Sequence, residues 1–186
     1  MLRRNLLKYI TKTVIKEEEL GTPSVVIDSY GDVIAYESTE EYTIENNESI
    51  DTGFIVFNGK DWSMHLHAKF SYWENNTVEY PTILNAMEEV EPYYGFIIRY
   101  EGSQLYFVER TNHWTLTADN NDEIDVYITY QNGTVTLINN SNIIATFNIE
   151  YHIDKLTFVI GSSIDSEGNP WRHANCIIYE FKVNRE

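Results

Sequence analysis

DEIDVYITY (Asp122–Tyr130) and QNGTVTLINN (Gln131–Asn140) begin the last third of the sequence, which continues with KLTFVIGSSID (Lys155–Asp165) and CIIYEFKV (Cys176–Val183). Each run is rich in Val, Ile, Tyr, Phe and Thr and is bounded by Asn, Gly, Asp or Ser, as β-strands are. Every second residue of the first run is apolar or aromatic, which predicts one face toward a core and one toward solvent. Runs of this kind recur about every ten residues and predict an all-β domain of two packed antiparallel sheets.

The order of these runs resembles that of the concanavalin A-like and laminin G-like jelly rolls, between Asp51 and Val183. The segments that carry the resemblance are Gly53–Phe57, Ser63–Phe70, Gly95–Tyr100, Thr134–Ile138, Phe158–Ser162 and Ile177–Val183. The resemblance implies a two-sheet antiparallel jelly-roll sandwich, with the last strand in the middle of a sheet or beside the first strand. Because such folds include lectins, glycan hydrolases, adhesion modules and viral structural proteins, it implies architecture and not chemistry.

The length of 186 residues and the 42% hydrophobic content suit one domain. We expect a single β-sandwich domain over residues 21–186 and an N-terminal arm over residues 1–20. The segment from Pro81 to about Val90 predicts one short helix inserted between strands and ended by Pro92. Ser29–Asp32 (SYGD) predicts a hairpin turn. Cys176, the single cysteine, lies in an apolar run and is expected to be a buried side chain.

Charge is distributed unevenly along the chain. The first sixteen residues carry +5 with no acid, whereas the remainder holds 8 basic and 29 acidic side chains, a net −21 within the total of −16. A body this acidic predicts no nucleic-acid partner, because phosphates would be repelled. The sequence has no apolar stretch of signal-peptide or transmembrane length, so we expect a protein made in the cytoplasm without a membrane partner.

The arm has the pattern of a docking element. In a helix, its basic and apolar side chains would form adjacent stripes, because both kinds recur every fourth residue. The residues expected to dock on a partner are Leu2, Arg3, Arg4, Leu6, Lys8, Ile10 and Lys12. The alternative is that Thr11–Lys16 forms a first strand behind a frayed tail.

The opening MLRRNLLKY resembles the short basic starts of structural proteins of tailed bacteriophages. That resemblance implies a structural or accessory component of a virion, assembled in the host cytoplasm. Its partners would be other virion proteins or copies of itself. This non-catalytic role is the first functional hypothesis.

Glu123 and Asp125 are the candidate catalytic residues. Their strand resembles the active-site strand of retaining β-glucanases, which implies Glu123 as nucleophile and Asp125 as its assistant. The third carboxylate of that pattern is absent, since Tyr127 and Ile128 occupy its two usual positions. Retaining hydrolysis needs a second carboxyl group to protonate the leaving group. An ordinary half-solvated strand explains these two residues better. A degenerate glycoside hydrolase is therefore only the third functional hypothesis.

Two patterns are candidate metal sites. His65 and His67 lie two apart on a predicted strand and so share a face, as two ligands of zinc or manganese would. Asp119 and Asp122, in an Asn- and Asp-rich loop, offer oxygen ligands for calcium. Each pattern also has a structural explanation, because solvated strands carry histidine and β-turns favour Asn and Asp.

Glycan binding is the second functional hypothesis. Aromatic residues near loops or strand ends offer flat faces for a sugar ring. The candidates are Trp73, Tyr93, Tyr94, Trp114 and Trp171. Aromatics in such places also close the ends of a sandwich, and a virion protein could bind a glycan as well.

Overall fold

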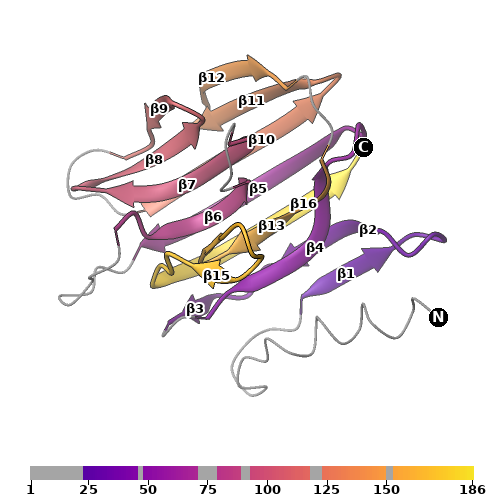
Figure 1. Cartoon of the computed structure of the whole chain (residues 1–186), viewed down its shortest axis with the longest axis horizontal. Helices are drawn as coiled ribbons and strands as arrows, with labels where there is room; N and C mark the ends of the chain where they lie inside the picture. The colour runs from indigo at the N-terminus through magenta and orange to yellow at the C-terminus, as the bar shows by residue number, and fades with distance from the viewer. Residues whose placement is uncertain (1–22, 46–47, 71–78, 89–92, 118–122, 150–152) are drawn as a thin grey trace.

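The computed structural model describes residues 23–45, 48–70, 79–88, 93–117, 123–149 and 153–186. Two β-sheets lie one over the other (Figure 1), and every pair of named strands is antiparallel. The eight-stranded sheet consists of β1 (Ser24–Ile27), β2 (Val33–Ser38), β3 (Tyr42–Ile44), β5 (Trp62–Phe70), β10 (Glu123–Gln131), β11 (Thr134–Asn139), β12 (Asn142–Asn148) and β16 (Cys176–Arg185). The six-stranded sheet consists of β4 (Ile50–Phe57), β6 (Thr82–Met87), β7 (Gly95–Glu101), β8 (Gln104–Glu109), β9 (Asn112–Thr115) and β13 (Ile153–Ile160). A small hairpin of β14 (Ser163–Ile164) and β15 (Pro170–Trp171) follows β13.

The strand order confirms a two-sheet sandwich consistent with a jelly roll. The larger sheet runs β1-β2-β16-β5-β10-β11-β12, with β3 also paired to β16, and the smaller runs β4-β13-β6-β7-β8-β9. β16 therefore lies in the middle of its sheet, as expected. The chain crosses between the sheets repeatedly, so that strands distant in sequence become neighbours.

The core lies between the inner faces of the two sheets. Its largest buried side chains are aromatic, and they come from both layers: Phe54, Phe57, Trp62, Phe70, Phe96, Phe107, Phe158 and Phe181. The indole N–H of Trp62 donates to the carbonyl oxygen of Val56 at 2.7 Å, so the one polar atom of this ring is satisfied. A second, small cluster of Met87, Ile97 and Val108 is buried on the other side of the six-stranded sheet.

The helix predicted from Pro81 to about Val90 is wrong in the described part of the segment. Residues 82–87 form β6, which lies between β13 and β7, and 89–90 lie outside the described residues. All six residues of β6 are buried. A strand covered on both faces loses the alternation of apolar and polar residues, and such a run resembles a buried helix in sequence.

Two local predictions are confirmed. The hairpin turn between β1 and β2 is closed by backbone hydrogen bonds from Asp28 N–H to the Asp32 carbonyl and from Gly31 N–H to the Asp28 carbonyl. Cys176 is fully buried, and burial raises the pKa of its thiol to about 12. In the described part of the chain, no helix is long and apolar enough to cross a membrane.

Candidate functional site

The predicted catalytic and metal-binding residues meet on the outer face of the eight-stranded sheet. β10 pairs with β5, so Asp125 and Glu123 stand beside the two histidines. Asp125 Oδ1 lies 2.6 Å from His65 Nε2, and Glu123 Oε1 lies 2.9 Å from His67 Nε2. The sequence suggested two separate sites, and the sheet joins them into one row of carboxylate–imidazole contacts.

Further charges extend this row onto β16 and β2. Glu180 Oε1 lies 3.5 Å from the other ring nitrogen of His65 and 2.5 Å from Lys182 Nζ, which also lies 3.2 Å from Glu37. The hydrogen bond from Lys182 lowers the pKa of Glu180, and the same bond raises the pKa of Lys182. The His65 ring also stacks on Tyr127 at a centroid distance of 4.1 Å.

This row resembles a line of surface hydrogen bonds between strands more than a catalytic centre. Glu123 and Asp125 each contact an imidazole, and both are about half exposed, in contrast to a proton-donating acid held in an apolar pocket. Among the described residues, no group of three or more His, Cys, Asp or Glu side chains is arranged to hold a metal ion. His65 and His67 therefore gain no third ligand from the residues that the structure describes, and their metal site stays a prediction.

The outer face of the six-stranded sheet carries a different set of side chains. Ile98 and Tyr100 of β7 pack against the core, so Arg99 and Glu101 between and after them face outward. Arg99 stands opposite Thr82 of β6 on one side and Tyr106 of β8 on the other. We call the residues gathered here the Arg99 cluster: Tyr80, Arg99, Glu101, Tyr106, His113, Trp171 and Arg172.

Polar contacts link the members of this cluster. Arg99 Nε donates to Glu101 Oε1 at 2.6 Å, and the other carboxylate oxygen of Glu101 lies 3.6 Å from His113 Nδ1. The Tyr106 hydroxyl donates to Gln104 Oε1 at 2.8 Å. Arg99 and Glu101 are only partly exposed, which fixes their side chains more firmly than those of a free surface pair.

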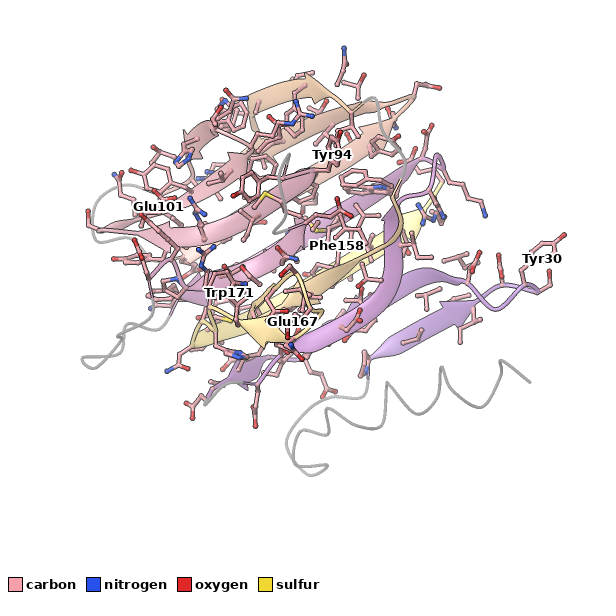
Figure 2. All side chains as sticks on the ribbon, viewed as in Figure 1. Tyr30, Tyr94, Glu101, Phe158, Glu167 and Trp171 are labelled. Carbon is pink, nitrogen blue, oxygen red and sulfur yellow. The ribbon has the colours of Figure 1, made fainter. Side chains whose placement is uncertain are left out.

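Guanidinium groups lie against the aromatic rings of this face. The Arg99 Cζ atom is 4.6 Å from the centre of the Tyr80 ring, and that of Arg172 is 5.7 Å from the same ring and 3.9 Å from the Trp171 ring. A similar pair, Arg110 over Tyr94 at 5.4 Å, lies beyond the cluster. These distances are within the range of cation–π attraction. Figure 2 labels Tyr94, Glu101 and Trp171 on this side, with Tyr30 far away at the β1–β2 turn.

Positive backbone φ angles occur at residues of these arginine–aromatic contacts and beside them. Tyr80, Tyr93, Arg110 and Arg172 have positive φ angles of 59°, 55°, 51° and 49°. Bulky residues rarely adopt this region, and strain of this kind gathers at functional sites. The remaining non-glycine cases lie in the tight turns around β11, where Asn and Ser adopt such angles readily.

The β14–β15 excursion places Trp171 and Arg172 beside β6. The backbone N–H of Thr82 donates to the Arg172 carbonyl at 2.9 Å, and the Thr82 hydroxyl lies 2.9 Å from that of Ser163. At the tip of the excursion, Asp165 accepts backbone N–H groups, and the bond from Asn169 lowers the pKa of its carboxyl group. Hydrogen bonds to Thr82 thus attach the base of the excursion to β6, and hydrogen bonds within the loop order its tip.

The aromatic residues predicted for glycan binding separate into three groups. Trp171, 38% exposed, belongs to the Arg99 cluster, and Tyr93 and Tyr94 lie in the connection between β6 and β7. Trp114 instead packs inward, since its ring stacks on Phe147 at 5.8 Å and closes an edge of the sandwich. Its place in a sugar site stays a prediction.

Several predicted residues lie outside the described part of the chain. They are Trp73, the calcium candidates Asp119 and Asp122, and the whole arm with Leu2, Arg3, Arg4, Leu6, Lys8, Ile10 and Lys12. Their roles stay predictions.

Sequence reasoning missed most of the Arg99 cluster. Arg99, Glu101 and Tyr106 carry no motif, and Tyr80, His113 and Arg172 come from separate segments. One signal was present: only four arginines follow the arm, and one of them stands on a strand between apolar residues. An arginine at an outward-facing position of a strand in so acidic a chain could therefore have been singled out from the sequence.

No protein-family model and no curated protein matches the sequence. Solved structures match in fold. The CBM40 domain of a Ruminococcus gnavus IT-sialidase, bound to α2,3-sialyllactose, has a TM-score of 0.54 at 12% identity, over 81% of this chain and 91% of that one. An alginate lyase from Corynebacterium sp. has a TM-score of 0.52 at 11% identity, over 89% and 82% of the two chains. A mutant Trypanosoma rangeli sialidase with trans-sialidase activity has a TM-score of 0.53 at 12% identity, over 90% of this chain and 30% of that one.

At such identities these likenesses establish the sandwich fold alone. They lend no support to a role in a virus particle, which stays a prediction from the sequence. The same holds for assembly in a host cytoplasm.

Proposed function

We propose that this domain binds carbohydrate without transforming it, and that the Arg99 cluster is the binding surface. The observation that carries the proposal is the combination of two partly exposed aromatic rings, Tyr80 and Trp171, with fixed polar groups around them. An aromatic face stacks on the apolar face of a sugar ring, and nearby side chains hydrogen-bond its hydroxyls. The glycan ligand of the similarly folded CBM40 domain agrees with this role.

A binding role fits this surface better than catalysis. Glu101, the carboxylate of the cluster, is already bonded to Arg99, and the neighbouring Glu79 is bonded to the Tyr80 hydroxyl. Glycoside hydrolysis would need a second carboxyl group facing the first. On the opposite sheet, Glu123 and Asp125 are likewise occupied by histidines.

The test is a glycan array followed by titration calorimetry on the glycans retained. Trp171→Ala should weaken binding at least about fivefold, because stacking of one ring contributes on the order of 1–3 kcal/mol. Tyr30→Ala is the matched control, since Tyr30 is an exposed aromatic far from the cluster. Equal affinity of both variants and the parent would show that the glycan binds elsewhere. An array with no retained glycan would refute the function.

The non-catalytic part is tested on the same glycans by mass spectrometry after prolonged incubation. We expect no product from the parent protein. A product that disappears in Glu123→Gln would restore the hydrolase hypothesis, and one that disappears in His113→Ala would assign catalysis to the Arg99 cluster.

A further inference from the structure

We propose that the ligand of the Arg99 cluster is an acidic glycan whose carboxylate is bound by Arg99, with Arg172 as a second cation beside it. The inference rests on the proposed function and adds the chemical class of the sugar. It follows from the placement and orientation of guanidinium groups in a chain that is otherwise acidic.

Arginine is concentrated on one face of the domain. Four arginines follow the arm, and three of them, Arg99, Arg110 and Arg172, lie over aromatic rings of or beside the six-stranded sheet. Arg110 also lies 3.6 Å from Glu109. The fourth, Arg185, contacts Phe54 instead. In a chain with a net charge of −16, an acidic ligand would be repelled by most of the surface. This face is where cations suited to planar, bidentate recognition gather.

Arg99 is held in a fixed orientation by two contacts. Its Nε atom donates to Glu101, and its guanidinium plane lies near the Tyr80 ring. Within the described part of the chain, these are the contacts of its side chain, so the edge formed by its two Nη atoms has no partner there. That edge presents parallel N–H groups, the arrangement that binds a carboxylate through two hydrogen bonds.

Arg172 places a second positive charge at the same ring. Its Cζ atom lies 5.7 Å from the centre of the Tyr80 ring that Arg99 also contacts. Its positive φ and the bond from Thr82 to its carbonyl fix the backbone that carries it. Glu101 lies against the Arg99 guanidinium, and Arg172 adds its own positive charge beside the same ring.

Carboxylates also lie at this surface, and they limit its electrostatic attraction for an acidic sugar. Glu101 is part of the cluster, and Glu79 hydrogen-bonds the Tyr80 hydroxyl, which raises the pKa of that phenol. Selectivity for an acidic sugar should therefore come from the directed bonds of Arg99 and not from long-range attraction. Salt should accordingly weaken binding only modestly, because short charged hydrogen bonds are screened less than distant charges.

The experiment compares each acidic glycan with its methyl ester, which keeps the shape of the sugar and removes the charge. The probes are trigalacturonic acid, trimannuronic acid and 3′-sialyllactose, each titrated as acid and ester into the whole protein, the Arg99→Gln variant and the Arg172→Gln variant. Lys182→Gln is the matched control, because it removes one positive charge from the opposite sheet. Circular dichroism checks that each variant is folded.

We expect at least one acid to bind about tenfold or more tightly than its ester. Arg99→Gln should abolish this difference, Arg172→Gln should reduce it, and Lys182→Gln should leave it unchanged. Binding of acid and ester with equal affinity, or retention of neutral glycans alone, would overturn this inference and leave glycan binding in place. A difference that survives Arg99→Gln would also overturn it. If no probe and no array glycan binds, the proposed function itself is wrong.

Discussion

Replacement of Phe158 by alanine should remove a large part of the stability of the sandwich. The Phe158 ring is fully buried, with centroids 5.3 Å from Trp62 and 5.9 Å from Phe181 in one sheet, and 6.0 Å from Phe54 and 6.1 Å from Phe96 in the other. The loss combines the transfer free energy of the ring with a cavity that four rigid rings cannot fill. Phe-to-Ala changes in such sites cost about 3–5 kcal/mol, and we expect a value in the upper half of that range.

The assay is equilibrium unfolding in urea, followed by tryptophan fluorescence and by far-ultraviolet circular dichroism. Ile143→Ala is the control, because that side chain is 70% exposed and should change the free energy of unfolding by no more than about 0.5 kcal/mol. A loss below about 1 kcal/mol for Phe158→Ala, with an unchanged denaturant slope, would refute the placement of this ring between the sheets.

Three further predictions concern other parts of the chain. Cys176 should not react with a thiol reagent at pH 8 in the folded protein, because the side chain is buried and burial raises the pKa of the thiol to about 12. It should react at once in urea, and fast labelling of the folded protein would contradict its burial. Since the bond from Lys182 lowers the pKa of Glu180 below its ordinary value of 4.5, the pair stabilises the fold above that pH and the stabilisation is lost as pH falls below it. Thermal unfolding from pH 6 to 3 should therefore be less pH-dependent in Glu180→Gln than in the parent, and identical slopes would argue against the pair. If the arm is a docking element, deletion of residues 1–16 should leave the thermal midpoint unchanged, and it should lower the mass in light scattering if the partner is another copy of this chain. An unfolded product would make the arm a strand of the sandwich.

Local features of the fold were predictable from local sequence. The alternation of Ile124, Val126 and Ile128 with Glu123 and Asp125 predicts which side chains of β10 are buried, and the structure confirms each of them. The turn of residues 29–32 was predictable for the same reason, since its glycine and polar residues lie next to one another.

Features that depend on strand pairing were not predictable. β6 was mistaken for a helix because a strand buried on both faces has no period of two. His65 and Asp125 are sixty residues apart, and only the pairing of β5 with β10 brings them together. The Arg99 cluster draws on β7, β8, β9, β15 and the segments before β6 and after β15, so no window of sequence contains it. The aromatic content predicted a glycan surface, whereas Trp171 alone among the predicted aromatics belongs to this cluster.

The central position of β16 determines when the domain can form during synthesis. β16 joins β2 and β3 on one side of the larger sheet to β5 on the other, and it is the segment of the sandwich that the ribosome makes last. Until residues 176–185 leave the exit tunnel, the two halves of that sheet have no common strand, and their apolar faces are open to water and to neighbouring nascent chains. A ribosome stalled before this point would therefore carry an incomplete sandwich with exposed apolar surface. Chaperones that bind such surfaces should release the chain only after the last strand has inserted.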